Sequence, residues 1–299
     1  MYVVIGATGN TGSVVANKLL NQNKKVRVVG RDAKRLASLF RKAEPFAGDV
    51  TDTAAITKAF EGAQAVYLMI PPNATTPDYS SYQKQIGEAY VTAIEKNKIK
   101  YAVTLSSFGA DKPEKSGPIL GLHNLEERLN RVSGLSVLHL RAAYFMQNTL
   151  GQADAIKQMG SVAGPLRPEL KIPMIAAHDI GAFAADVLSH LEFAGQQVQE
   201  LHGQRDISYA EITSILGKAI GKPDLNYLTL TRDQFRDALI KQVGMSQSVA
   251  NLLAEMSESL DSGYLPFLEP RTARSTTPTS YETFVEEEWL PKYQEKRAA

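Results

Sequence analysis

The chain has 299 residues, of which 43% are hydrophobic and 22% charged, as is ordinary for a globular protein that buries a sizeable core. Its 33 lysines and arginines nearly balance its 32 aspartates and glutamates, which argues against nucleic acid or an anionic membrane surface as partner. The absence of cysteine excludes disulfides, thiolate catalysis and cysteine metal ligands. No apolar run is long enough for a membrane span or a secretory signal, so we expect a cytoplasmic protein without a membrane partner.

Short apolar runs alternate with helical patterns through the first half of the chain. Strands are predicted over 2–5, 25–29, 45–47, 65–70, 101–105 and 136–141, and helices over 11–22, 33–41, 53–61, 79–97 and 121–133. The strands are rich in Val, Ile, Leu and Tyr and mostly lack polar alternation, as expected of strands buried on both faces. The β-α-β-α order predicts an α/β fold with a doubly wound, parallel, Rossmann-type sheet.

The second half of the chain has a different rhythm. Residues 142–177 are rich in glycine and proline and predict loops, whereas a helix over 178–191 and a strand over 197–202 are expected to rejoin the sheet. Capping boxes are predicted at Ser208 with Glu211, Thr231 with Gln234, and Thr279 with Glu282, after a linker over 275–280. We therefore expect a main domain over 1–150, to which 177–204 return, and a smaller, mainly helical region over 151–176 and 205–299.

A glycine-rich turn follows the first predicted strand directly and opens the first helix. It consists of Gly6, Ala7, Thr8, Gly9, Asn10, Thr11 and Gly12. Glycine lets the backbone approach a pyrophosphate closely, and the N–H groups at a helix N-terminus attract the anion. In this strand–turn–helix context a GxxGxxG segment predicts a dinucleotide-binding loop, the alternative being a tight turn without a ligand. The main domain would then bind the cofactor and the smaller region the substrate.

The end of the second strand indicates which dinucleotide is bound. An acidic residue usually holds the ribose hydroxyl of NAD at this point, but Gly30 offers no carboxylate and Arg31 offers a fork suited to a 2′-phosphate. Lys34 and Arg35 add positive charge, so NADP(H) is favoured over NAD(H). Two alternatives stay open: the cations form a solvated helix start, and Asp32 either holds a ribose or caps the helix.

Several motifs together resemble the atypical short-chain dehydrogenase/reductases, and best of all their NmrA-like branch. They are the glycine turn, Gly48-Asp49-Val50 after the third strand, Ile70-Pro71-Pro72 after the fourth, residues 133–141, and Tyr144-Phe145-Met146-Gln147-Asn148. The resemblance covers nearly the whole chain and is specific for the fold more than for an activity.

This resemblance implies further cofactor contacts. Asp49 and Val50 would lie near the adenine, and Ile70, Pro71 and Pro72 beside the ribose and pyrophosphate. The loop 143–145, with Tyr144, would lie near the nicotinamide. Ser106 or Ser107 would orient the substrate, and Ser106 would also contact the cofactor. Each has a plainer alternative, since Asp49 can cap a helix, the prolines can end a strand, and the loop and serines can serve packing or a turn.

The chain departs from the wider superfamily in its catalytic residues. The usual general acid is a tyrosine four residues before a lysine, but by alignment these positions fall near Ile119 and at His123. Alcohol–ketone chemistry by that route is therefore not expected. His123 and Glu127, four apart on a predicted helix, instead resemble the His-x-x-x-Glu of a bacterial NADPH–quinone reductase and a triphenylmethane dye reductase of this branch.

The leading hypothesis is a reductase that transfers hydride from NAD(P)H to a quinone-like or other electron-poor aromatic acceptor, with His123 and Glu127 as catalytic candidates. His123 would donate a proton or hydrogen-bond the substrate, the alternative being a purely structural pair with Glu127. A rival is a non-catalytic NADP(H) sensor with a protein partner. A reductase of a biosynthetic intermediate is less favoured, since the isoflavone-reductase-like relatives carry lysine at the position of His123.

The histidines show no metal-ligand spacing, so no metal is expected. A monomer and a homodimer are both compatible with the sequence.

Overall fold

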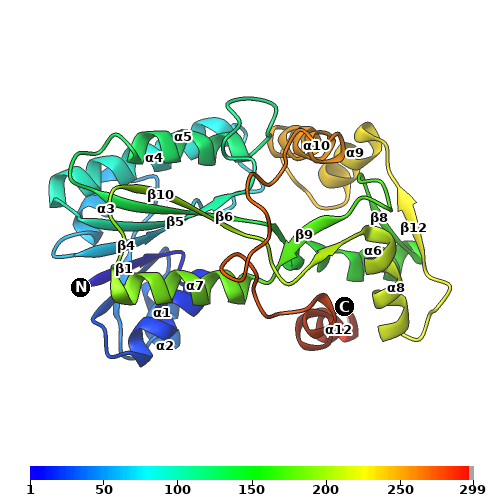
Figure 1. The fold of residues 1–299 in the computed structure, drawn as a ribbon, viewed down its shortest axis with the longest axis horizontal. Helices are drawn as coiled ribbons and strands as arrows, with labels where there is room; N and C mark the ends of the chain where they lie inside the picture. The colour runs from blue at the N-terminus through cyan, green and yellow to red at the C-terminus, as the bar shows by residue number, and fades with distance from the viewer. Residues whose placement is uncertain (296–299) are drawn as a thin grey trace.

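Seven parallel strands form the central sheet of the computed structural model, which describes residues 1–295 (Figure 1). Their order is β10-β6-β5-β4-β1-β2-β3. The strands are β1 (Tyr2–Ile5), β2 (Val26–Gly30), β3 (Glu44–Ala47), β4 (Ala65–Leu68), β5 (Tyr101–Ser107), β6 (Ser136–Ala142) and β10 (Gln196–Leu201). The predicted doubly wound sheet is confirmed. Its chain order reverses between β1 and β4, where such sheets bind ligands at the carboxyl ends of the strands.

Helices cover both faces of this sheet. One face carries α1 (Gly12–Asn21), α2 (Ala33–Leu39) and α7 (Ala177–His190), and the other carries α3 (Thr53–Ala59), α4 (Tyr79–Asn97) and α5 (Ile119–Leu129) (Figure 1). Successive strand residues point to opposite faces of the sheet. Val4 packs on the side of α1, whereas Val3 and Ile5 pack on the side of α4. Both faces are therefore buried, which explains why the strands show no polar alternation.

The late return of the chain to the sheet is confirmed by α7 and β10. Strand β10 pairs in parallel with β6 at the edge of the sheet. Helix α7 packs so closely on α1 that a Cβ at Gly181 would lie 2.7 Å from the carbonyl oxygen of Thr11. These contacts place both elements in the same layers as the first 150 residues.

Aspartates start the helices that follow three of the strands. The carboxylate of Asp32 accepts hydrogen bonds from the backbone N–H groups of Lys34 and Arg35 at 2.9 and 3.0 Å and so caps α2. Asp52 and Asp78 cap α3 and α4 in the same way. Such a cap stabilises a helix by about 1 kcal/mol. Of the two roles left open for Asp32, the structure shows the cap.

The remaining chain forms two small sheets and further helices. The sheets join β7 (Tyr144–Phe145), β9 (Ile172–Ile175) and β11 (Asp206–Ile207), and β8 (Ser161–Gly164) with β12 (Asn226–Thr229). The helices are η1 (Met146–Thr149), α6 (Gln152–Met159), α8 (Tyr209–Ala219), α9 (Arg232–Lys241), α10 (Gln247–Asp261), α11 (Tyr281–Phe284), η2 (Val285–Trp289) and α12 (Leu290–Gln294). The prediction of loops over 142–177 was wrong, because short strands that pair only with distant segments leave no periodic signal.

Hydrogen bonds test the predicted capping boxes. Those at Ser208 and Thr231 are confirmed, but the one at Thr279 is wrong, because Ser280 caps α11. The hydroxyl of Thr279 donates to Asp179 of α7 at 2.8 Å, and Glu282 binds Arg205 at 2.7 Å. Both side chains of the predicted box, Thr279 and Glu282, therefore bind residues of other elements instead of each other's backbone.

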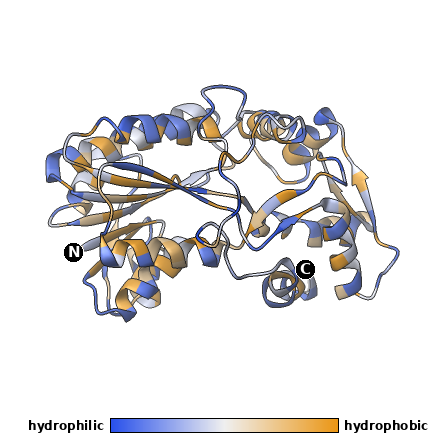
Figure 2. Ribbon diagram, viewed as in Figure 1, coloured by the Kyte–Doolittle hydropathy of each residue, from blue (hydrophilic) through white to orange (hydrophobic). Residues whose placement is uncertain are grey.

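The C-terminal helices are held by a second apolar core. Trp289 is fully buried, and its indole N–H donates to the carbonyl of Thr149 at 3.0 Å. The hydroxyl of Tyr281 donates to Thr149 Oγ1 at 2.9 Å. Figure 2 shows apolar residues along the strands and on the inner sides of the helices in both halves. Within residues 1–295, no helix combines the length and apolarity needed to cross a bilayer.

Candidate active site

The turn between β1 and α1 is built so tightly that side chains are excluded from it. Gly6 has φ of +67°, and its carbonyl oxygen accepts from Gly9 N–H at 2.9 Å. A Cβ at Gly12 would overlap that same carbonyl, and a Cβ at Gly6 would lie 2.7 Å from Met69 Sδ. Backbone packing therefore requires glycine at position 12, and the positive φ favours glycine at position 6, where a Cβ would also crowd the Met69 side chain.

The same turn leaves hydrogen-bond donors free. In the part of the chain that the structure describes, the N–H groups of Asn10, Thr11 and Gly12 have no acceptor, whereas Ser13 N–H donates to Gly9 at 3.1 Å. Thr8, Gly9 and Asn10 are exposed and Ala7 is buried. Free donors at the positive end of α1, in a turn that glycine keeps open, suit the pyrophosphate of a dinucleotide.

Thr11 contributes to the turn through its backbone rather than its side chain. Its hydroxyl oxygen accepts a hydrogen bond from the buried Tyr67 of β4 at 2.9 Å. Burial raises the pKa of the Tyr67 phenol, which stays protonated and able to donate. The predicted contact of Thr11 with a cofactor would therefore be made by its N–H group.

Charged residues lie at the carboxyl ends of β2 and β3. Arg31 and Lys34 are exposed. The carboxylate of Asp49 accepts from Thr51 N–H at 2.9 Å and from the Thr51 hydroxyl at 2.7 Å; these bonds lower the pKa of Asp49, and the charge of Arg31 lowers it further. Asp49 thus does not cap α3, which contradicts the plainer alternative for this residue, and Val50 is half-buried beside it.

The segment that follows β4 is pinned next to the glycine turn by two tyrosines of α4. The hydroxyl of Tyr90 donates to the carbonyl of Met69 at 2.7 Å, and that of Tyr82 donates to the carbonyl of Pro71 at 3.0 Å. Ile70 is buried and Pro72 exposed. No sequence motif marks the roles of Met69, Tyr82 or Tyr90, because their partners are backbone atoms of another element.

Ser106 belongs to a buried ionic network between β5, α5 and β6. Its hydroxyl donates to Glu126 Oε1 at 2.5 Å, and Arg141 donates to the two oxygens of Glu126 at 3.1 and 2.6 Å. Ser106 and Glu126 are each 4% exposed. The proton of the Ser106 hydroxyl is thus taken by Glu126, so Ser106 would meet a cofactor only as an acceptor, and Ser107, the next residue along the strand, faces the opposite side of the sheet. Glu126, which no motif singled out, is the buried carboxylate of α5.

His123 and Glu127 do not pair with each other. The Nδ1 of His123 lies 2.8 Å from the carbonyl oxygen of Ala110, in the loop after β5, while the exposed Glu127 binds Arg131 at 3.2 Å. The alternative of a structural His123–Glu127 pair is therefore wrong. Since a carbonyl only accepts, Nδ1 carries the proton, and Nε2 of the neutral ring is left as an acceptor. The aligned tyrosine position, Ile119, is buried at 3% exposure.

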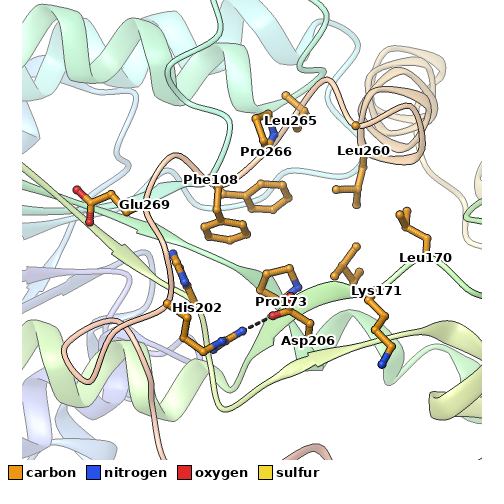
Figure 3. A pocket seen from close by; sticks show the side chains of 14 residues that line it. Phe108, Leu170, Lys171, Pro173, His202, Asp206, Leu260, Leu265, Pro266 and Glu269 are labelled. Atoms are coloured by element: carbon orange, nitrogen blue, oxygen red, sulfur yellow. Dashed lines mark hydrogen bonds and ion pairs between the residues drawn. The ribbon is translucent and has the colours of Figure 1, made fainter.

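A small cavity of about 320 Å³ lies where residues 262–271 cross near the ends of β5 and β10 (Figure 3). Phe108, just after β5, stacks on Phe267 with ring centroids 5.0 Å apart, and the ring of His202 meets Phe267 edge-on at 4.4 Å. Glu200 holds this crossing segment by accepting from the N–H groups of Leu268 and Glu269 at 3.1 and 3.0 Å. Aromatic faces thus gather beside the end of β5.

A large cavity of about 1230 Å³ adjoins the small one, since Leu260 lines both. Its walls come from α6, β8, α9 and α10, and Tyr144 of β7 forms part of its lining. Tyr144 follows the carboxyl end of β6 almost directly, and burial raises the pKa of its phenol. The predicted nicotinamide loop 143–145 therefore borders a space that accommodates a bulky apolar molecule. Within residues 1–295, no cluster of three or more His, Asp or Glu side chains is arranged to hold a metal ion.

Comparison with known proteins agrees with this architecture. NAD(P)H azoreductase of Xenophilus azovorans is 30% identical over 268 residues, which are 89% of this chain and 89% of that enzyme. The structure of an NADPH-dependent quinone oxidoreductase from Escherichia coli in complex with NADPH superimposes with a TM-score of 0.74 at 23% identity, over 92% of this chain and 97% of that one. The triphenylmethane reductase of Citrobacter sp. complexed with NADP(H) gives 0.75 at 17% identity, over 96% and 99%.

The family assignment rests on nearly the full length of the sequence. The profile of the NmrA-like family matches residues 2–290, from the first strand of the sheet to the last helix. The chain belongs to the NmrA-like family.

Proposed function

We propose that this protein is an NADP(H)-dependent oxidoreductase that reduces a quinone-like or other electron-poor aromatic acceptor. The observation that carries the proposal is the glycine turn, whose free N–H donors and excluded side chains suit a dinucleotide pyrophosphate. The azoreductase relative, named for NAD(P)H, and the two reductases solved with NADPH or NADP(H) support the same cofactor and reaction class.

The residues around the turn divide the work of binding the cofactor. The N–H groups of residues 10–12 would hold the pyrophosphate, Arg31 and Lys34 would meet the 2′-phosphate, and Asp49 with Val50 would border the adenine. Ile70, Pro71 and Pro72, held in place by Tyr82 and Tyr90, would pass along the ribose. The nicotinamide supplies a hydride, and the protein's contribution is to hold the acceptor over it.

The acceptor would lie on the side of the two cavities. We assign residues 1–150 and 177–204 to cofactor binding, and 151–176 with 205–299 to acceptor binding. An electron-poor ring accepts hydride without a strong protein acid, so the missing tyrosine–lysine pair is no obstacle. His123 would move the proton, because its Nδ1–H is fixed on the carbonyl of Ala110 and its Nε2 would be the ring atom that exchanges a proton with the acceptor. Glu127, exposed and bound to Arg131, would contribute less.

The test is NADPH consumption, followed at 340 nm, with a panel of quinones and azo and triphenylmethane dyes. We expect acceptor-dependent turnover in the wild type and a roughly tenfold or greater loss of kcat in His123→Ala, in line with the usual contribution of a general acid. Glu127→Gln, one helical turn away, is the matched control and should retain its rate within about twofold. An equal loss in both variants would remove the separate role of His123.

A non-catalytic sensor is the competing function, motivated by Ile119 and His123 at the usual catalytic positions. It predicts that NADPH binds, as seen by nucleotide fluorescence, but that no acceptor in the panel is reduced. That pair of results would overturn the proposed reductase.

A further inference from the structure

We infer that the large cavity binds the apolar body of an extended, uncharged, multi-ring acceptor, and that helix α9 selects it. This inference rests on the proposed reductase function, because it places the reacting end of the acceptor at Tyr144. The volume of about 1230 Å³ exceeds that of most small-ligand sites, and a single-ring acceptor would leave most of it empty.

Helix α9 presents an apolar stripe to the cavity. Phe235, Ala238 and Leu239 follow the i, i+3, i+4 spacing of one helix face, and all three line the cavity. None of the ten residues of α9 is fully buried. These three side chains are only half-buried, so an apolar ligand that covered them would gain from the hydrophobic effect.

The next helix, α10, is tied to the main domain by hydrogen bonds that α9 lacks in the described part of the chain. At the start of α10, Ser246 N–H donates to the carbonyl of Ala74 at 2.8 Å, and Tyr79 N–H donates to Ser248 Oγ at 3.0 Å. Further along, Gly117 N–H donates to Glu255 Oε1 at 3.1 Å. These bonds tie α10 to the segment after β4 and to the loop before α5.

Helix α9 is held mainly through α10. Its principal packing partner is α10, to which Arg232 adds an exposed ion pair with Glu258 at 2.7 Å. Gly244, between the two helices, has φ of +79° and no neighbour that would crowd it. Helix α9 can therefore adjust its distance from α6 to fit ligands of different thickness while α10 keeps the acceptor end fixed.

The charges around the cavity disfavour anionic ligands. Asp154, Asp233 and Asp237 line it together with a single cation, Lys241. Asp233 and Asp237 also bind Arg236, at 2.9 and 3.5 Å, so these residues together carry three negative and two positive charges. A permanently charged sulfonate would lose hydration against the apolar stripe without gaining a free cation.

A pair of azo dyes that differ by one group tests the ligand class. The probes are 4-dimethylaminoazobenzene, which is neutral, and methyl orange, which is the same molecule with a sulfonate. Equilibrium dialysis without NADPH should give a dissociation constant at least about tenfold lower for the neutral dye, because only the sulfonate must be desolvated. Equal affinities, or tighter binding of methyl orange, would overturn the inference. This measurement needs no variant.

A pair of α9 substitutions tests the site. Phe235→Ala combined with Leu239→Ala should weaken binding of the neutral dye about tenfold or more, through loss of apolar contact. Leu228→Ala, on an exposed residue of β12 outside the cavity, is the matched control and should change it less than twofold. Turnover of 1,4-benzoquinone, whose single ring would fill only a small part of the cavity, should stay within twofold in all variants. Unchanged dye affinity in the double variant would overturn the inference even if benzoquinone is reduced normally.

The two proposals can fail separately. Dye binding that depends on α9, with no reduction of any acceptor, would sink the reductase and leave the cavity assignment in place. Reduction of benzoquinone, with no dye bound in the cavity, would support the reductase and overturn the cavity assignment.

Discussion

The glycine turn and the large cavity are built in opposite ways. In the turn there is no room for a side chain: a Cβ at Gly12 would meet the backbone carbonyl of Gly6, and a Cβ at Gly6 would meet the side chain of Met69. In the cavity, side chains of α6 and α9 face one another across open space. The first arrangement leaves room for one group in one position, and the second accepts many shapes.

This difference fits what each side would bind under the proposed function. A pyrophosphate is small and charged, so fixed donors at a helix N-terminus would hold it best. An acceptor ring would need only apolar contact and approximate alignment, which the cavity beside α9 would supply. We expect substitutions in the glycine turn to weaken binding strongly and substitutions in the cavity to change selectivity.

The largest effect is expected at the network behind the end of β5. Glu126→Ala leaves Arg141 buried without its carboxylate, which should lower the free energy of unfolding by about 3–5 kcal/mol. The neighbouring Glu127→Ala removes only an exposed pair with Arg131 and should cost less than about 1 kcal/mol. Denaturant titration of both variants measures this, and similar losses would show that the network does not distinguish the two carboxylates.

The tightness of the glycine turn is tested by Gly12→Ala. The added Cβ meets a backbone carbonyl that cannot move without opening the turn, so the dissociation constant of NADPH should rise about 100-fold. Gly151→Ala is the matched control, since a Cβ there meets nothing within 4 Å. Fluorescence titration with NADPH provides the measurement. Normal affinity in Gly12→Ala would contradict the view that the two sides differ in rigidity.

Arg31→Ala sharpens the assignment of the cofactor's phosphate. Loss of the charged fork should weaken NADPH by about tenfold and leave NADH within about twofold, because only NADPH carries the 2′-phosphate. Arg41→Ala, also exposed but beyond the end of α2, should alter neither. An equal loss for both nucleotides would assign Arg31 to the shared part of the cofactor.

The smallest effect concerns the pH dependence of stability and arises at His139 in the central sheet. His139 is buried between Thr104 and Asn130, and burial lowers its pKa to about 4. The unfolded chain takes up this proton near pH 6.5, as free histidine does, whereas the folded chain does not until about pH 4. The stability is therefore complete above pH 6.5 and falls as the pH drops.

From pH 6.5 to 5.5 the loss attributable to His139 is about 1 kcal/mol. Denaturant titration across this window should show a shallower slope in His139→Asn than in the wild type. His190→Asn, on a half-exposed side chain of α7, should keep the slope of the wild type. An unchanged slope in His139→Asn would show that His139 is not the group that titrates.

Much of the fold was predictable because its signals are local. The strands of the sheet were placed to within two residues, since their apolar runs are bounded by glycine, proline and helix caps such as Asp52. The same holds for the capping boxes at Ser208 and Thr231. The short strands β8 and β12 were missed, because each pairs in a sheet with the other, across 61 intervening residues.

The candidate site divides in the same way. The glycine turn was predictable because all of its glycines lie in one short segment, residues 6–12, between a strand and a helix. The partners of His123, Ser106 and Asp49 were not, because the sequence offers each side chain several possible hydrogen-bond partners and the fold selected among them. For His123 that partner is the carbonyl of Ala110, 13 residues away, rather than Glu127 on the next turn.

The sequence by itself determined the doubly wound sheet, the dinucleotide turn and the missing tyrosine–lysine pair, because these depend on residue types within one segment. The tertiary structure decided which donors of the turn stay free, that Glu126 rather than Glu127 is buried, and that α9 turns an apolar face to an open cavity. Such features depend on which surfaces meet after the chain has folded, and no local pattern encodes that meeting.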